Sequence, residues 1–173
     1  QLDPHTFGDL EDQVALVAHG GYGRRELAPF SDIDLMILHR TAITEPVAVL
    51  AVRLLRDLSD SGLIVGHSVR TTRQALALSL EDPLIFTSLV ESRHVSGNME
   101  LTDRFLGRLR KIAHRHARKL LPAIDDARRE ERRQYGETVY LLEPNIKRSR
   151  GGLRDIQLLR WIGFCLYGTS DPD

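Results

Sequence analysis

The spacing of hydrophobic and polar residues changes several times along the chain, and each change marks an expected element. Residues 14–18 and 33–38 are short apolar runs bounded by glycine, proline or aspartate, which is typical of buried strands. Residues 63–69 predict a third strand that lies beside the second. Helical patterns with start and stop signals predict helices over residues 46–60, 72–80, 82–92 and 153–166.

The chain changes character after residue 98. Residues 99–133 are charged and favour helix, and Pro122 is expected to divide them into two helices. The basic run RLRKIAHRHARK within them is typical of a solvated helix face. We therefore predict an α/β (α+β) fold, with a small mixed sheet carrying helices on one face in residues 1–97. A helical domain in residues 98–173 is expected to flank a cleft between the two.

Composition narrows the class of protein. The 173 residues are 42% hydrophobic, and 24 basic residues balance 24 acidic ones, which argues against a general nucleic-acid-binding protein. Cys165 is the only cysteine, and no apolar run reaches the length that spans a membrane. We therefore expect a cytoplasmic protein. Because the sequence starts without methionine and ends in a polar tail, we expect a piece of a longer protein.

The first candidate site lies between the first two predicted strands. Gly20 and Gly21 follow the first strand, where the missing side chains let the backbone turn sharply and approach a ligand. A helix is expected to begin over residues 22–27, so its N–H groups would face an anion above the glycines. Arg24 would add positive charge for a phosphate group.

Asp32 and Asp34 stand at the start of the second strand. Strand residues two apart project to the same side, so the two carboxylates would repel unless a cation joined them. Oxygen ligands of this kind suit Mg²⁺, with Mn²⁺ as the alternative ion. Ser31 is placed to contact phosphate or to brace the aspartates.

A dinucleotide-binding site is the competing interpretation of the same glycines. Gly21 and Gly23 could open a G-x-G-x-x-G fingerprint, but Glu26 occupies the third glycine position. No acidic residue ends a second strand at the distance that a ribose contact requires. The sequence therefore disfavours this alternative on two counts.

A second candidate site precedes the last predicted helix. Basic residues that include Lys147 stand before Gly151 and Gly152, a pattern that suits phosphate contacts at a helix start. Lys147, Arg154 and Asp155 are therefore candidate site residues. For Arg154 and Asp155, bracing of the helix start is an equally good explanation.

These motifs together resemble a known family. The glycine pair followed by SDIDL resembles the nucleotidyltransferase superfamily that includes DNA polymerase β. GGYGRREL, GHSVRT, ESR and LEPNIKRSRGGLRDIQLLRWI, in this order, resemble the PII uridylyltransferase family. The resemblance covers nearly the whole chain. It implies a polymerase-β-like fold and Mg²⁺-dependent transfer of UMP from UTP to a tyrosine of the PII nitrogen-signalling protein.

The resemblance leaves the third ligand of the site unassigned. In the wider superfamily the third strand commonly supplies a further carboxylate, but residues 63–69 contain none. His67, Glu91 and Asp155 are the candidates, beside water and the substrate. His67 is favoured as a structural hydrogen-bonding residue, and Glu91 as the partner of Arg93 in an ion pair.

Two further functions compete with uridylyl transfer. An adenylyltransferase that acts on glutamine synthetase is the nearer, because that family also carries GG, DxD and a glycine-rich NIK-x-GG-R motif. GGYGRREL and GHSVRT favour the uridylyl family. The other is a regulatory domain that binds a nucleotide without turnover, which the missing third-strand acid makes conceivable.

Overall fold

The structure is a computed structural model, and it describes residues 10–40, 44–135, 143 and 145–169. The chain divides into two compact units. The sheet unit comprises residues 1–78 and 91–108, and the helical unit comprises residues 79–90 and 109–173. No helix within the described ranges has the length and apolar character needed to cross a membrane.

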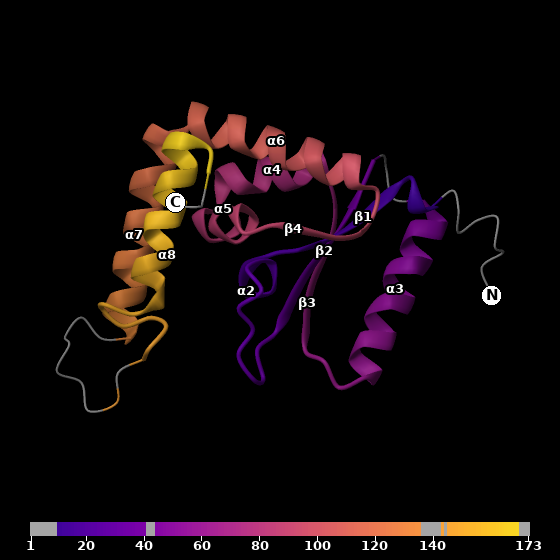
Figure 1. Ribbon diagram of the computed structural model, residues 1–173, viewed down its shortest axis with the longest axis horizontal. Helices are drawn as coiled ribbons and strands as arrows, with labels where there is room; N and C mark the ends of the chain where they lie inside the picture. Colours follow the sequence, from indigo (N-terminus) through magenta and orange to yellow (C-terminus); the bar gives the residue numbers. More distant parts are fainter. Residues whose placement is uncertain (1–9, 41–43, 136–142, 144, 170–173) are drawn as a thin grey trace. The chain divides into compact units, whose positions relative to one another are not determined.

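The sheet unit contains four strands and the helices around them (Figure 1). Its elements are β1 (Val14–Ala18), α2 (Gly20–Gly23), β2 (Ile33–His39), α3 (Glu45–Asp60), β3 (Val65–Thr71) and β4 (Arg93–Gly97). Helices α4 (Thr72–Glu81) and α6 (Met99–Arg115) begin in this unit.

The strand order is β3-β2-β1-β4, and the sheet is mixed. β1 is antiparallel to β2 and to β4, whereas β2 and β3 are parallel. The predicted α/β class, the mixed sheet and the place of the third strand beside the aspartate-bearing strand are therefore confirmed. β4 was not predicted, because all residues of this short edge strand are at least partly exposed and it carries no apolar run.

Helix α3 lies along the sheet and covers part of it (Figure 1). The apolar side chains that it and the strands bury together come from Leu10, Val14, Ile37, Val47 and Ala51. Their burial follows from the helical stripe in α3 and from the apolar strand runs, as predicted. This core fixes β1 and β2, between which the glycine turn is held.

The helical unit contains α5 (Pro83–Val90), α7 (Ala117–Tyr135) and α8 (Leu153–Tyr167), with α7 and α8 side by side (Figure 1). Phe86 of α5 and Phe164 of α8 meet edge to face, with ring centroids 6.4 Å apart. Next to Phe164, the thiol of Cys165 is fully buried, and this burial raises its pKa to about 11.

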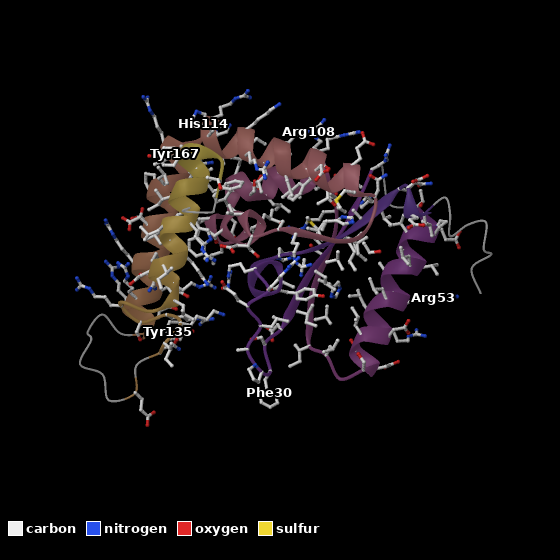
Figure 2. The ribbon with its side chains drawn as sticks, in the orientation of Figure 1. Phe30, Arg53, Arg108, His114, Tyr135 and Tyr167 are labelled. Atoms are coloured by element: carbon white, nitrogen blue, oxygen red, sulfur yellow. The ribbon has the colours of Figure 1, made fainter. Side chains whose placement is uncertain are left out.

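The predicted break at Pro122 is wrong, because Pro122 lies inside α7. The helices separate at His116, which lies upstream of the proline. A proline ring clashes with the carbonyl four residues before it, here that of Arg118. Pro122 therefore lacks the N–H that would bond to this carbonyl, but the helix continues beyond it to Tyr135. The basic run around this break is largely exposed, as predicted, and Arg108 and His114 project away from α6 (Figure 2).

The helix predicted over residues 22–27 is also placed wrongly. Helix α2 ends at Gly23, and residues 26–28 are not helical. Arg25 has a φ of 62°, which lies in the left-handed region and cannot continue an α-helix.

We expect alanine substitution to have opposite effects at two glycines. Gly97 has a φ of +82°, and a Cβ there would lie 2.4 Å from the carbonyl oxygen of Val14. Gly97→Ala should therefore lower the free energy of unfolding by about 1–3 kcal/mol. Gly107 lies inside α6 with nothing within 4 Å of the added atom, so Gly107→Ala should raise it by up to about 1 kcal/mol. Urea titration of both variants checks this, and destabilisation of equal size in both would contradict it.

Candidate active site

The turn from β1 into α2 presents backbone N–H groups. Gly20 has a φ of 56°, a left-handed conformation that glycine adopts without strain. The hydrogen bonds of α2 begin with the N–H of Gly23, which donates to the carbonyl of His19 at 3.0 Å. The N–H groups of Gly20, Gly21 and Tyr22 are therefore the orphan donors of a helix start, which suit an anion.

Gly23 and Arg93 hold α2 in place. A Cβ on Gly23 would lie 1.9 Å from the carbonyl oxygen of Glu91, so only glycine allows this approach. Arg93 donates to the carbonyls of Tyr22 at 3.1 Å and Gly23 at 3.2 Å, and its guanidinium lies 5.3 Å from the Tyr22 ring centroid. This cation therefore binds the carbonyl end of α2. The sequence had predicted an ion pair for Arg93, and no local pattern indicates this role.

Arg24 is engaged by two carboxylates. Its Nε lies 2.7 Å from Glu26, and its Nη1 lies 3.3 Å from Glu91. The side chains of Arg24 and Glu91 are only 10% and 4% exposed, so this pair is largely shielded from water. Glu91 therefore pairs with Arg24, and not with Arg93 as predicted.

Asp32 and Asp34 stand at the start of β2. Asp32 is exposed just before the strand, and Asp34 is its second residue. Across the parallel pair Asp34 is in register with Gly66 of β3. A Cβ on Gly66 would come within 2.7 Å of Asp34 Oδ1, so this glycine leaves room for the carboxylate. Ser31 is exposed beside them, and its N–H donates to Ala28 at 3.1 Å.

The chemistry of these two aspartates fits a hard cation. Within the described ranges, neither carboxylate takes part in a side-chain hydrogen bond or an ion pair, so their oxygens remain available as ligands. The part of the chain that the structure describes contains no cluster of three or more histidine, cysteine, aspartate or glutamate side chains suited to a metal. Mg²⁺ usually takes one or two protein carboxylates and completes its shell with water and phosphate, which this pair would permit.

Two histidines lie near the aspartates along the sheet. His67 is in register with Leu35, so strand alternation places it on the face opposite to Asp34. His19 was not predicted as a site residue, yet its N–H donates to the carbonyl of Asp34 at 3.1 Å. Burial lowers the pKa of the His19 imidazole, the charge of Asp34 opposes this shift, and the charge of Arg70 adds to it. The neutral imidazole is therefore favoured beside the site.

Lys147, Arg154 and Asp155 belong to the helical unit. The Lys147 side chain is exposed, while its N–H donates to Asn145 Oδ1 at 3.1 Å. Arg154 donates to Gln157 at 2.9 Å, and its guanidinium lies 5.6 Å from the Trp161 ring centroid. Arg154 Nε also lies 3.9 Å from Glu131 of α7, so the side chain is engaged within the helical unit.

Arg128 of α7 organises the loop that precedes α8. Its side chain is 1% exposed, and it donates to the carbonyls of Arg148 at 2.8 Å and Ser149 at 3.1 Å. It also donates to Asp155 Oδ1 at 3.0 Å. A buried guanidinium needs acceptors for its N–H groups, and the loop supplies them.

The glycine pair of this loop has a structural explanation. Gly151 has a φ of +78°, and a Cβ on Gly152 would lie 2.5 Å from the carbonyl oxygen of Ile146. Asp155 Oδ2 accepts a hydrogen bond from the Gly151 N–H at 2.7 Å. Asp155 therefore braces the start of α8, which is the structural alternative that the sequence had left open.

Asp155 is stabilised in its ionised form. Burial opposes ionisation, but hydrogen bonds from Arg132 and Gly151 and the charges of Arg128 and Arg132 outweigh it, so the pKa of Asp155 lies below its ordinary value of 3.8. A carboxyl whose pKa is lowered by folding stabilises the folded state above its unfolded pKa. This stabilisation is lost as the pH falls through the folded pKa.

We expect Asp155→Asn to destabilise the protein in a pH-dependent way. The variant should unfold at lower urea concentration than the unsubstituted protein at about pH 7, and the difference should shrink toward about pH 3. Asp126→Asn is the matched control, because Asp126 also lies near an arginine but is 75% exposed. A difference between Asp155→Asn and the unsubstituted protein that does not change with pH would contradict the ion-pair assignment.

Comparison with known proteins gives the relatives of this chain. Residues 110–173 match the family model described as GlnD PII-uridylyltransferase. Similar sequences named bifunctional uridylyltransferase/uridylyl-removing enzyme come from Pseudomonas putida, at 43% identity over 94% of this chain, and from Azospirillum brasilense, at 40% over 97%. One from Streptomyces coelicolor is 41% identical over 86%.

A solved structure described as a crystal structure of the toxin-antitoxin with AMP-PNP has 15% identity and a TM-score of 0.45, over 71% of this chain and 93% of that one. The chain spans 18% of the length of each of the three bacterial enzymes. The aligned length covers nearly all of the present sequence in two of these relatives and 86% of it in the third. The chain therefore belongs to the bifunctional uridylyltransferase/uridylyl-removing enzyme family.

Proposed function

We propose that this chain carries the site that transfers UMP from UTP to a tyrosine of the PII signalling protein, with release of pyrophosphate, in the cytoplasm. The names of its relatives support uridylyl transfer, and the description of the matched family model supports a PII acceptor. The observation that carries the proposal is the pair of unengaged carboxylates, Asp32 and Asp34, that follows a turn rich in N–H donors.

In this proposal the glycine turn binds the triphosphate. Gly20 and Gly21 would donate their N–H groups to phosphate oxygens, and the absence of side chains would let the backbone approach closely. Arg24 was expected to add positive charge for the phosphates. Its ion pairs with Glu26 and Glu91 favour a positioning role instead, in which Arg24 holds the end of α2.

Asp32 and Asp34 would hold Mg²⁺, and the ion, when bound, would neutralise charge that develops on the α-phosphate and the pyrophosphate. Two features of the sheet unit would hold this site in position. The hydrogen bond from the His19 N–H to the Asp34 carbonyl ties the glycine turn to β2, and Gly66 leaves room at the Asp34 carboxylate. Ser31 would contact phosphate or brace the aspartates, and Lys147 and Arg154 remain proposed nucleotide contacts.

We expect Asp34→Asn to lower the rate of UMP transfer by about 100-fold or more, because it removes one charged ligand while keeping the side-chain volume. The measurement is transfer of radiolabelled UMP from UTP to PII protein with Mg²⁺, together with pyrophosphate release. Asp60→Asn, at the exposed end of α3, is the control and should leave the rate unchanged. Transfer by Asp34→Asn at the unsubstituted rate would exclude the metal-binding role.

The same assay separates the proposal from its rivals. Preference for ATP, with glutamine synthetase as the acceptor, would support the adenylyltransferase. Nucleotide binding without pyrophosphate release would support a regulatory domain without turnover.

Gly66→Ala should separate the site from the fold. The added Cβ would displace the Asp34 carboxylate, which is the movable end of a side chain, so the free energy of unfolding should change by less than about 1 kcal/mol. Binding of UTP in the presence of Mg²⁺, measured by calorimetry, should weaken by roughly 10–100-fold, as for other groups that position a metal ligand. Gly107→Ala is the control. Unchanged Mg²⁺-dependent binding by Gly66→Ala would mean that the position of the Asp34 carboxylate is unimportant.

A further inference from the structure

Two uncharged runs of the sheet unit carry exposed apolar side chains. Residues 27–31, LAPFS, lead toward β2, and residues 61–65, SGLIV, lead into β3. We call their four exposed apolar side chains the apolar rim. They are Leu27, Phe30, Leu63 and Ile64, which are 41%, 99%, 41% and 65% exposed.

The two runs lie at the same end of the sheet. β2 and β3 are parallel, so the residues before each strand are neighbours, and the N–H of Ile33 donates to the carbonyl of Ile64 at 2.8 Å. Exposed apolar residues scattered singly are normal on a protein surface, whereas a group of them marks an interaction site. The apolar rim is such a group, gathered in a chain of which 28% is charged.

Phe30 is the most prominent member of the apolar rim. Its side chain projects from the tip of the loop between α2 and β2 (Figure 2). Its φ of 64° lies in the left-handed region, where residues with a bulky side chain are rarely found. Neither burial within the sheet unit nor backbone preference accounts for a phenylalanine at this position. A contact with a surface outside the sheet unit would account for it, because aromatic residues are enriched at protein interfaces.

The apolar rim adjoins the candidate active site in the sequence and in the sheet. Phe30 precedes Asp32 by two residues, and Ile64 precedes Gly66 by two. In the proposed reaction the acceptor is a whole protein, whose hydroxyl group must reach a nucleotide held by Asp32 and Asp34. The surface of that protein around the hydroxyl must therefore meet the surface around the aspartates, to which the apolar rim belongs.

Resting on the proposed function, we infer that the apolar rim is the docking surface for the acceptor protein. Its side chains become buried against an uncharged, apolar part of the acceptor beside the hydroxyl that receives the nucleotide. Phe30 is the anchor of this contact, since burying an aromatic side chain at an interface contributes more than its smaller neighbours can.

The test is the double variant Phe30→Asn/Ile64→Ser. Asparagine adopts the left-handed conformation more readily than phenylalanine, so the loop is not strained further. The surface control is Val52→Ser, at a position on α3 of the same unit that is 58% exposed. Phe30→Leu, which retains an apolar side chain, tests whether apolar bulk restores function. The probes are PII protein and UTP with Mg²⁺, in steady-state kinetics and calorimetry.

We expect KM for the acceptor protein to rise by roughly 10–100-fold in the double variant, the equivalent of losing one or two buried apolar side chains. The Kd for UTP and kcat at saturating acceptor should stay within about twofold. Val52→Ser should leave the acceptor KM unchanged. Phe30→Leu should keep the acceptor KM close to that of the unsubstituted protein.

Three outcomes in the double variant would overturn the inference. An unchanged acceptor KM would show that the apolar rim does not meet the acceptor. A weakened Kd for UTP with unchanged acceptor KM would show that the apolar rim holds the nucleotide, and a lower molecular mass in solution with unchanged acceptor KM would show that it joins two copies of this chain. If the unsubstituted protein binds UTP but transfers nothing to PII, the proposed function itself fails, and the inference falls with it.

Discussion

The close approach of Gly23 to the backbone of Glu91 is the constraint on which the candidate site depends. No side chain fits between these two segments, and their contact brings Arg93 to the carbonyl end of α2. A helix of four residues has too few internal hydrogen bonds to hold itself together. The direction of its N–H groups is therefore determined by tertiary contacts. The β4 segment, at the edge of the sheet, sets the geometry of the glycine turn after β1.

In the helical unit, too, contacts between distant residues set the shape of a loop, but here a buried charged side chain makes them. Arg128 is a charged side chain within the interior, where it would be strongly destabilising without partners. Its acceptors are carbonyls of the loop before α8 and the Asp155 carboxylate, so ordering the loop also satisfies the arginine. The contact of Gly23 orders the glycine turn after β1, and the buried Arg128 orders the loop before α8. In both, the motif's shape is set by residues distant in the sequence.

This distance explains what the sequence could and could not predict. The α/β class, three strands and most helices follow from local patterns, which is why β1 and α3 fall where periodicity placed them. β4 escaped because an exposed edge strand lacks an apolar run. The pairing of Arg93 with α2 spans 70 or more residues, and no local pattern encodes it. Arg128 lies in a charged stretch that resembles a solvated face, and only tertiary structure shows it to be buried. The motifs identified Asp32 and Asp34 as neighbours. The space that Gly66 leaves for Asp34 could be recognised only from the register of β2 and β3.

The burial of Cys165 has a practical consequence for spectroscopy. The chain has one cysteine, which is fully buried in α8 and has a raised pKa, so almost none of it is thiolate at neutral pH. Maleimide and iodoacetamide probes react with accessible thiolates. A cysteine introduced at a solvated position such as Arg53, on the outer side of α3 (Figure 2), would therefore be labelled selectively in the native background. Fluorophores or spin labels can be attached without first removing the natural thiol, whose replacement would disturb the packing beside Phe164.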